Sequence, residues 1–426
     1  NIVIQGTTRG TTTDMDGNYS IEAPEDATLV FSFVGYQEVT VDIEGQQQIN
    51  VEMEQAVTEL EEVVAVGYGT QQRRDITGSV SSVDMEEAPT IDIPNTNVLS
   101  ALKGQISGLN IGAANSAGDQ PGMLIRGQNS ISASNAPLIV LDGVIYQGAL
   151  SDINLDNIAT VDVLKDASAT AVYGSRAANG VLLLTSKKGE KGKPTIRLNT
   201  STGVNMWQQK QDIMGPEKYL QIRMDRRQVD DPLDIPELKT PEEENIKAGN
   251  TVDWYDLGSR VGLNQDYQLS VSGGGEDINY FVSGGYNNEE GVIVGDQFEK
   301  ISLTAKVDAD ITDWLEMGVD GRYSYRTYEG VGANKAEILR APPYGNAYVT
   351  WEEGGEKKRH YEKYPVGESS TNALWGTTGK TVEDIQDLNF FRFNGYADIE
   401  IPFIEGLSYR LNYSHNLQTN NTGRFN

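Results

Sequence analysis

Strict alternation of apolar and polar residues marks the second half of the chain. Along residues 298–311 the odd positions are apolar and the even positions are polar, and residues 315–327, 389–403 and 406–418 repeat the pattern. A period of two predicts β-strands. Counting in this way predicts seven strands, at about 195–206, 264–273, 277–287, 298–311, 315–327, 389–403 and 406–418.

Two structures show such alternation: a soluble antiparallel sheet with one wet face, and the wall of an outer-membrane β-barrel. The predicted connections favour the second, because short turns such as Thr312-Asp313 alternate with long segments at 208–264 and 329–388. Short turns at one rim, long loops at the other and aromatic girdles near the rims are typical of such barrels. Aromatic residues cluster near the strand ends at Trp314, Tyr323, Tyr325, Phe390, Phe391 and Phe403.

We therefore predict a membrane β-barrel over residues 194–426. Bacterial single-chain barrels have even strand numbers, and a barrel with a plugged lumen needs about 22 strands. Seven is odd, so we expect that only the first part of the barrel is present and that further strands follow Asn426.

Three different patterns precede the strands. Residues 1–55 show short alternating runs separated by Asp-Gly or Gly turns, which predicts a small all-β sandwich, N-terminally incomplete because the chain opens inside an expected strand. Residues 56–80 are polar apart from the run VVAV and read as a linker. Residues 81–193 mix short helical and strand patterns with glycine turns, which predicts an α+β domain.

One acidic stretch in the first domain resembles a calcium loop. Its oxygen-bearing residues have EF-hand spacing, but Tyr19 occupies the position where that loop turns on glycine, and no flanking helices are visible. A hairpin turn is the better interpretation. The residues concerned are Asp14, Asp16, Asn18, Ser20, Glu22 and Glu25.

Composition excludes several functions. The 426 residues carry a net charge of -28, which argues against nucleic acid as a partner. Cysteine is absent and only His360 and His415 are present, so thiolate chemistry and metal sites of Cys or His are poorly supplied. No apolar run approaches the roughly 18 residues of a membrane helix. We predict no metal and no cofactor.

Enzymatic motifs are also missing. The glycine-rich stretch DASATAVYGSRAANG lacks the spacing of a phosphate-binding loop, and its small residues suit close helix packing on a sheet. Asp142 and Asp166 have no partner at acid/base spacing. We predict no catalytic residue, and so no enzyme.

Six motifs, in order over residues 6–192, resemble the SusC/RagA family of TonB-dependent outer-membrane transporters of Bacteroidetes-type bacteria. They are GTTTDMDGNYSI, ELEEVVAVGYGTQQRRDITGSVSSV, ALKGQISGL, IRGQNSI, PLIVLDGV and VLKDASATAVYGSRAANGVLLLTSKKG. The resemblance implies a carboxypeptidase-regulatory-like extension at 1–55, a TonB box within 56–80, a plug domain at 81–193 inside the barrel, and a SusD-like lipoprotein as a lid.

The resemblance places the TonB box at Glu61, Glu62, Val63, Val64, Ala65 and Val66. A short β-branched strand with polar flanks suits capture by another protein's sheet edge, where main-chain hydrogen bonds share a pulling force. The alternative is that VVAV is the last strand of the first domain.

Each of the other candidate sites has more than one interpretation. Arg126 is a candidate plug–barrel contact, or an ordinary surface arginine. Gln128, Asn129 and Ser130 would contact cargo from a plug loop, or form a structural turn. Aromatic residues of the long 329–388 loop would contact cargo, contact the lid, or pack together: Tyr344, Tyr348, Trp351, Tyr361, Tyr364 and Trp375.

The expected function is TonB-dependent import of an oligosaccharide or peptide. The expected partners are TonB with its inner-membrane motor, the lid lipoprotein, the cargo and outer-membrane lipid, with dimers of transporter–lid pairs possible. The first domain and TonB box would be periplasmic. The alternatives are a structural or adhesive surface protein that uses the barrel as an anchor, and a TonB-dependent signalling receptor.

Overall fold

The computed structural model divides the chain into two units, residues 1–64 with 71–75, and residues 65–70 with 76–426. The residues it describes are all except 1, 6, 8, 15–16, 25–26, 34–35, 37–38, 44, 54–62, 67–68, 73–79, 89–97, 133, 167–170, 211, 330, 368–369, 378–382, 405 and 426.

The first unit contains one four-stranded antiparallel sheet in the order β2-β1-β3-β4. Its core is apolar and is built from Ile2, Ile4, Leu29, Phe31 and Ile43, against which partly buried residues of 19–23 and 49–53 pack. Among the described residues this unit has one sheet covered by such segments, and the sandwich arrangement stays a prediction. The strands are β1 (Ile2–Ile4), β2 (Gly10–Thr11), β3 (Thr28–Phe31) and β4 (Val39–Asp42).

The acidic stretch of this unit forms a turn. The Asp14 carboxylate accepts a hydrogen bond from the Asn18 backbone N–H at 2.8 Å. Among the described residues no three acidic or histidine side chains are grouped to hold a metal ion, while Asp16 and Glu25 lie outside those residues. The geometry supports the turn interpretation.

A short sheet follows, in which β5 (Val63–Val66) pairs with β6 (Gly69–Gln72) among the described residues. The VVAV run is therefore a strand, as its β-branched residues predict. Its partner strand is not one of the four strands of the first unit.

The region predicted as the plug has a mixed five-stranded sheet in the order β11-β10-β13-β12-β7. β10 and β13 are parallel, and the other pairs are antiparallel. Leu141, Val163 and Leu182 are fully buried between this sheet and short helical turns. The elements are β7 (Val80–Asp84), α1 (Val98–Leu102), β10 (Leu138–Leu141), β11 (Val144–Ile145), η2 (Leu150–Asp152), η3 (Leu155–Asn157), β12 (Ile158–Leu164), η4 (Ala171–Ala177) and β13 (Val181–Ser186).

A separate hairpin of this region consists of β8 (Leu109–Ile111) and β9 (Met123–Ile125). The loop 112–122 forms its tip, and the Gly112 N–H donates to the Gly122 carbonyl at 2.9 Å to close it. At the base of the hairpin, the Arg126 N–H donates to the Gly108 carbonyl at 2.8 Å. The tip and the base therefore lie at opposite ends of the hairpin.

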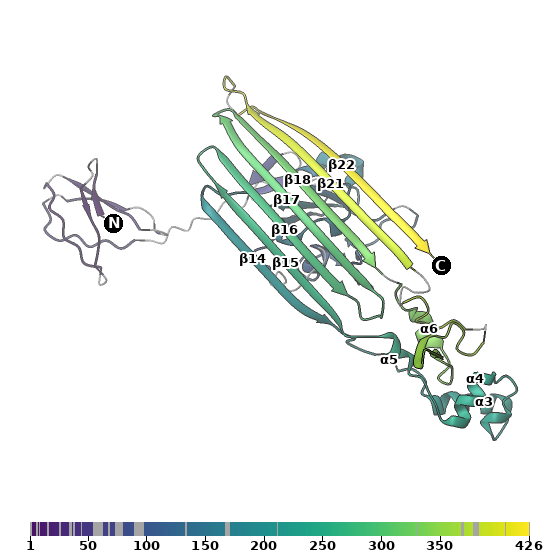
Figure 1. Cartoon of the computed structure of the whole chain (residues 1–426). Helices are drawn as coiled ribbons and strands as arrows, with labels where there is room; N and C mark the ends of the chain where they lie inside the picture. The colour runs from purple at the N-terminus through teal and green to yellow at the C-terminus, as the bar shows by residue number, and fades with distance from the viewer. Residues whose placement is uncertain are drawn as a thin grey trace. The chain divides into compact units, whose positions relative to one another are not determined.

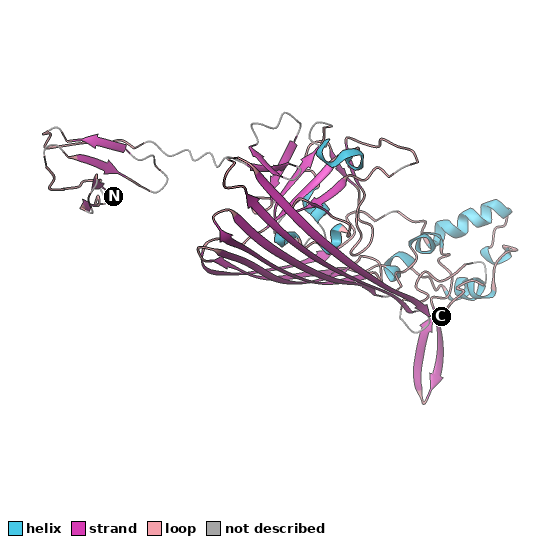
Figure 2. Ribbon diagram, turned by 90° about the horizontal axis from the view of Figure 1, so that it is seen from above, coloured by secondary structure: helices cyan, strands magenta, loops and turns pink. Residues whose placement is uncertain are grey.

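All seven predicted long strands are present and form one antiparallel meander, here called the wall sheet. Figures 1 and 2 show its strands crossing one side of the plug elements. Most strands extend a few residues beyond the predicted limits. They are β14 (Gly192–Asn205), β15 (Gly262–Gly274), β16 (Ile278–Glu290), β17 (Gln297–Thr312), β18 (Leu315–Glu329), β21 (Glu383–Glu400) and β22 (Ser408–Phe425).

The wall sheet buries its polar face and exposes its apolar face. On β17, Lys300, Ser302 and Lys306 are each 4% exposed. The neighbouring Ile301 and Leu303 are 38% and 53% exposed. A soluble sheet buries its apolar face and wets its polar face, whereas a membrane barrel does the reverse. This inversion favours the barrel interpretation.

The long connections contain helices that the sequence analysis did not predict. Side-chain caps fix two of them: Asp253 accepts from the Tyr255 and Asp256 N–H groups, and Asn334 from Ala336 and Glu337. Across the described residues, every helix is too short or too polar to pass through a membrane. The elements are α3 (Pro216–Arg227), η5 (Pro232–Asp234), α4 (Thr240–Ala248), α5 (Trp254–Gly258), α6 (Lys335–Arg340), β19 (Tyr348–Glu353) and β20 (Glu356–Tyr361).

Candidate functional site at the plug–wall interface

Asp142 lies at the centre of the contacts between plug and wall sheet. It occupies the tight turn between β10 and β11 with a φ of 52°, followed by Gly143 at 79°, a conformation that Asp and Gly tolerate well. The turn presents the carboxylate to the end of β13, where it accepts from Ser186 N and Oγ, each at 2.8 Å. These bonds hold the carboxylate through contacts within the plug itself.

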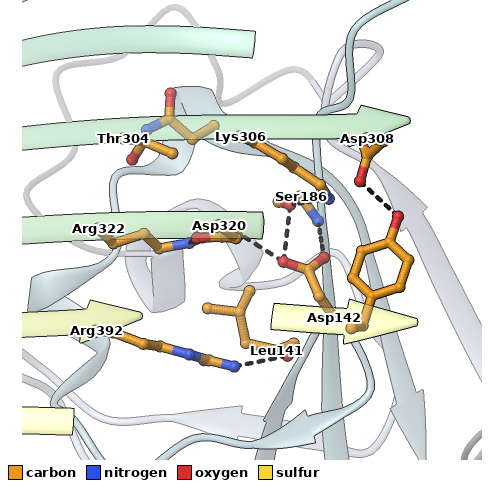
Figure 3. Close-up of polar contacts among 11 residues, drawn as sticks. Leu141, Asp142, Ser186, Thr304, Lys306, Asp308, Asp320, Arg322 and Arg392 are labelled. Atoms are coloured by element: carbon orange, nitrogen blue, oxygen red, sulfur yellow. Dashed lines mark hydrogen bonds and ion pairs between the residues drawn. The ribbon is translucent and has the colours of Figure 1, made fainter. Parts of the chain in front are cut away.

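The wall sheet supplies cations to this carboxylate (Figure 3). Arg322 Nη2 of β18 donates to Asp142 Oδ2 at 2.9 Å, and the same guanidinium binds Asp320 through Nε at 2.9 Å and Nη2 at 2.7 Å. Lys306 Nζ of β17 donates to Ser186 Oγ at 3.3 Å. The side chains of Arg322 and Asp142 are only 10% and 16% exposed.

Electrostatics keep Asp142 ionised. Burial alone would raise the pKa of its carboxyl group, but the positive charges of Lys306 and Arg322 and the Ser186 hydrogen bonds outweigh burial and lower the pKa to about 2. Such a buried pair is strong while both partners remain, and removing one partner leaves an uncompensated charge.

Arg392 of β21 lies directly opposite Arg322 in the strand register. Like charges in that position repel, and the two guanidinium groups take different partners. Arg392 Nη2 donates to the Leu141 carbonyl at 3.3 Å, and its guanidinium carbon lies 5.5 Å from the centroid of the Tyr146 ring. Wall strands β18 and β21 thus contact the end of β10 and its turn, and the adjacent strand β17 contacts the end of β13.

A second ion pair holds another part of the plug. Arg326 Nε of β18 lies 2.7 Å from Asp152 Oδ1 in η2, and Arg326 Nη1 donates to Ser151 Oγ at 2.6 Å. The side chains of Arg326 and Asp152 are 5% and 2% exposed. Among the described residues, two separate buried arginine–carboxylate pairs therefore join the plug to the wall sheet.

Neutral hydrogen bonds extend the interface toward β15. Asn154 Nδ2 donates to Gln268 Oε1 at 2.8 Å and to Ser302 Oγ at 3.1 Å. Asn157 Nδ2 donates to Thr304 Oγ1 at 3.1 Å and accepts from Gln268 Nε2 at 3.0 Å. These residues belong to η3 and its cap on one side and to the polar face of the wall sheet on the other.

The tip of the β8–β9 hairpin contacts the wall at the end with the long connections. Asp296 accepts from Ala117 N at 3.1 Å, Glu289 accepts from Gly118 N at 3.1 Å, and Tyr328 donates to the Gly118 carbonyl at 3.2 Å. Lys335 Nζ of α6 donates to the Asn115 carbonyl at 2.6 Å. The plug is thus held at this rim as well.

Arg126 pairs with a carboxylate of the plug, and its predicted role as a plug–barrel contact stays a prediction. Its Nη1 lies 2.5 Å from Asp166 Oδ1, and the two side chains are 54% and 31% exposed. Both residues belong to the plug, so this ion pair does not join plug and wall. The wall contacts are made by the other plug residues described above.

The candidate cargo residues on the following loop bond to the loop itself. Asn135 Oδ1 accepts from the N–H groups of Asn129 and Ser130 at 2.8 and 2.7 Å, and Gln128 Nε2 donates to the Ser130 carbonyl at 2.9 Å. This loop comes directly after the base of the β8–β9 hairpin. The tip of that hairpin is the end that contacts the wall rim with the long connections. These contacts support the structural turn, and a cargo role for these three residues stays a prediction.

The loop aromatics separate into packed and exposed groups. Tyr344 is 8% exposed and Tyr348 stacks on Tyr361 at 5.0 Å, with both tyrosines of that pair packed against a core of the long connections. Trp351 is 40% exposed and meets His360 edge-on at 5.1 Å. His360 also approaches Trp375, at 6.5 Å. Self-packing explains the tyrosines, and Trp351 remains a surface candidate.

For the predicted TonB box, the structure describes the backbone of Val63–Val66 as β5, while Glu61 and Glu62 lie outside the described residues. The sequence analysis did not single out Arg322, Arg326, Arg392 and Asp152. A signal was present for the three arginines, because they lie on the polar side of predicted barrel strands, which faces the inside of the barrel; Asp152, in η2, had none.

Chemically, the interface is a set of paired charges and not a reaction centre. Each buried carboxylate described here binds an arginine or a backbone N–H, which leaves none poised for acid/base work. The arrangement holds two parts of one chain together through polar contacts that separate without breaking a hydrophobic core.

Comparisons with known proteins agree with this architecture. The family model of the TonB-dependent Receptor Plug Domain matches residues 72–181, and that of the CarboxypepD_reg-like domain matches residues 1–65. TonB-dependent receptor P3 of Formosa agariphila is 33% identical over 444 residues, which cover 100% of this chain and 41% of that protein. TonB-dependent receptor SusC of Bacteroides thetaiotaomicron is 33% identical over 365 residues, covering 82% of this chain and 34% of SusC.

Solved structures show the same fold. The RagAB peptide importer in its open-open state superposes with a TM-score of 0.71 at 24% identity, covering 85% of this chain and 43% of that one. The chain spans well under half the length of each of these proteins. A plug domain, a wall sheet with an apolar outer face and relatives named as TonB-dependent receptors agree with the motifs in the sequence. The chain belongs to the SusC/RagA-type family of TonB-dependent transporters.

Proposed function

We propose that the protein imports a nutrient, an oligosaccharide or a peptide, across the outer membrane with force supplied through TonB. The inverted polarity of the wall sheet carries this proposal. Its apolar face is exposed as a lipid-facing surface requires, and its polar face binds the plug through buried ion pairs. In a complete barrel, a plug held in this way would close the pore, and import would require that the pore be opened.

Opening by mechanical force agrees with the character of these contacts. An outer membrane offers neither ATP nor an ion gradient, so energy has to arrive through a partner that pulls. The ion pairs of Arg322 and Arg326 stabilise the seated plug, and water replaces their partners when the plug moves. A hydrophobic interface would instead expose apolar surface on opening.

The β5 strand, which we expect to lie in the periplasm, is the proposed segment that TonB pulls. It pairs with β6 in a two-stranded sheet, which is marginally stable on its own in water. Exchange of β6 for a strand of TonB would therefore cost little, and the new main-chain hydrogen bonds would carry the load. Glu61 and Glu62 complete the proposed TonB box.

A SusD-like lipoprotein lid over the long connections, and pairing of such complexes into dimers, belong to the same proposal. The exposed Trp351 is a candidate contact for that lid or for cargo. The adhesive and the signalling functions remain the rivals of import.

Uptake in living cells tests the function. Cells that express the full-length protein are given radiolabelled peptide and oligosaccharide mixtures, with TonB intact or deleted and with a proton uncoupler. Import predicts uptake that requires both TonB and the proton gradient. Uptake independent of TonB, or surface adhesion without any uptake, contradicts the proposal.

A further inference from the structure

Buried cations gather on the polar face of the wall sheet where it meets the plug. On this face of β17, β18 and β21, the cross-strand rows from the pair Lys300 and Arg326 to the pair Lys306 and Asp320 contain five cations and one carboxylate. Each of the five cations is between 2% and 8% exposed. They are called here the cation band, and Figure 3 shows three of them around Asp142. Its members are Lys300, Lys306, Arg322, Arg326 and Arg392.

The seated plug balances part of this charge. Asp142 and Asp152 of the plug pair with the two arginines of β18. In the same rows, the polar face from β15 to β22 carries two carboxylates of its own, Asp266 and Asp320. When the plug moves away, five cations therefore face two carboxylates, which leaves three positive charges on this part of the wall.

Arg392 forms no ion pair within the described part of the chain. Its Nη2 donates to the Leu141 carbonyl at 3.3 Å, while Nε and Nη1 are buried without a hydrogen-bond partner among the described residues. Its guanidinium carbon lies 5.5 Å from the centroid of the Tyr146 ring. Such a cation–π contact replaces only part of the hydration that a buried guanidinium loses. In the seated state, Arg392 therefore carries a charge that its plug contacts do not need.

Movement of the plug would uncover this charge. Leu141 and Tyr146, which cover Arg392, flank the β10–β11 turn, so a shift of that turn exposes the guanidinium to the lumen that the polar face of a barrel strand lines. Toward the short turns the same face is acidic, because Asp308 and Glu316 both accept from the Tyr396 hydroxyl, at 2.5 and 2.8 Å. An anion is therefore attracted to the cation band and not to the whole face.

We propose that the cation band binds a carboxylate group of the cargo once the plug has moved. Release of the Leu141 carbonyl frees Arg392 Nη2 beside Nε, and this fork of N–H groups binds a carboxylate with two parallel hydrogen bonds. Lys306 and Arg322, on the two adjacent strands, add positive charge around the same point.

The inference rests on the proposed import function and narrows its cargo to molecules that carry carboxylates. Both proposed cargo classes include such molecules, because an oligosaccharide can contain uronic acids and a peptide can contain acidic side chains. The chemistry at the cation band is the same for the two, so the experiment has to compare a charged and a neutral member of each class.

Uptake by cells that express the full-length protein tests the proposal. The labelled probes are a Gly/Ser peptide against a peptide of equal length with central Glu residues, and maltotriose against trigalacturonate, with cells lacking TonB as the background. We expect the carboxylate-bearing member of at least one pair to enter about tenfold faster, because hydrogen bonds to charged groups are the strong ones. The pair that shows this preference identifies the source of the carboxylate. Equal rates within both pairs would overturn the proposal.

Variants of Arg392 locate the binding site. Arg392→Gln removes a charge without breaking an ion pair, and should abolish the roughly tenfold preference while the neutral members enter as before. Arg392→Lys keeps the charge and should keep most of the preference. The matched control is Arg410→Gln, on the same face, because Arg410 pairs at 3.4 Å with Asp398, a wall residue that stays beside it when the plug moves.

Two results with these variants contradict the proposal. One is an unchanged preference in Arg392→Gln that reaches the cell surface at the normal level. The other is an equal rise in TonB-independent uptake of both members of each pair, which would show that Arg392 only holds the plug in place.

Ion selectivity, measured without TonB, separates this inference from the import function. The full-length protein is placed in a planar bilayer with a KCl gradient, and urea loosens the plug. The reversal potential of the wild type should lie further toward that of chloride than the potential of Arg392→Gln, and equal potentials contradict the proposal whatever uptake shows. TonB-dependent uptake without a charge preference removes the cation-band proposal alone. A charge preference in uptake that ignores TonB removes the import mechanism alone.

Discussion

Arg322 of the wall sheet and Asp142 of the plug form a buried ion pair at 2.9 Å across the interface between the two. The pair joins residues 180 positions apart in sequence. It is one of two arginine–carboxylate pairs that fix the plug against β18. We expect the seated plug to depend on these pairs more than on any apolar contact.

Removing the arginine tests that dependence. Arg322→Met leaves Asp142 and Asp320 buried with an uncompensated charge, and should cost about 3–5 kcal/mol of stability. Asp142→Asn should cost less, because Arg322 keeps Asp320 as a partner. Heat-induced mobility shifts on gels, together with vancomycin sensitivity of the cells, report stability and leakage.

The control for this series is Asp166→Asn, which removes a partly exposed pair inside the plug. Partly exposed pairs contribute little, so this variant should behave as the wild type. Equal effects of Arg322→Met and Asp166→Asn would contradict the role of the interface pair.

Acid should weaken the Asp142 contact only at low pH. The folded-state pKa of Asp142 is lowered to about 2 from its ordinary 3.8, so its ionisation stabilises the fold fully above pH 3.8. That contribution disappears as the pH falls through about 2. Thermal unfolding followed from about pH 6 to about pH 2 should show a steeper acid loss in the wild type than in Asp142→Asn. Parallel curves would refute this assignment.

A charge on the outer face of the wall sheet should block membrane insertion. Leu303 lies in the middle of β17 and is 53% exposed, so Leu303→Arg would place a cation in lipid at a cost of about 2–4 kcal/mol. Ile213→Arg, at an exposed apolar position outside the strands, is the matched control. Assembly assays in outer-membrane vesicles measure both, and normal assembly of Leu303→Arg would favour a soluble sheet.

The plug tip tolerates no side chain at Gly118. Its φ is 66°, and a Cβ there would lie 2.1 Å from the Phe298 ring, so Gly118→Ala should destabilise the tip by about 1–3 kcal/mol. Gly122→Ala meets no atom within 4 Å and should change little. Hydrogen exchange at Ala117 and Gly118 compares the two variants, and equal protection would show that the tip is not held by this packing.

The wall sheet was predictable because one rule, alternation, applies to every strand. Its seven strands could be predicted without knowing which strands they pair with. The alternation also showed which face of each strand is polar and which is apolar. The helices of the long connections were not, because a helix such as α3 buries no residue and shows no apolar stripe. Whether these helices form depends on tertiary contacts, which the sequence pattern does not show.

The interface illustrates a second limit. Asp142 appeared isolated in sequence because its partners lie on two wall strands and on β13. Arg126, predicted for a similar role, pairs with Asp166 of the plug, 40 positions away in sequence. The sequence alone showed which residues lie on the polar face of the wall sheet. It did not show which plug residues they contact.

The most direct test of the import mechanism is deletion of residues 61–66 in the full-length protein. The account predicts normal surface levels, normal cargo binding and loss of energised uptake, because these residues are needed for pulling and not for folding. A deletion of equal length at 73–78, in the predicted linker after the proposed TonB box, controls for shortening the chain. Unchanged uptake after deletion of 61–66 would contradict the account.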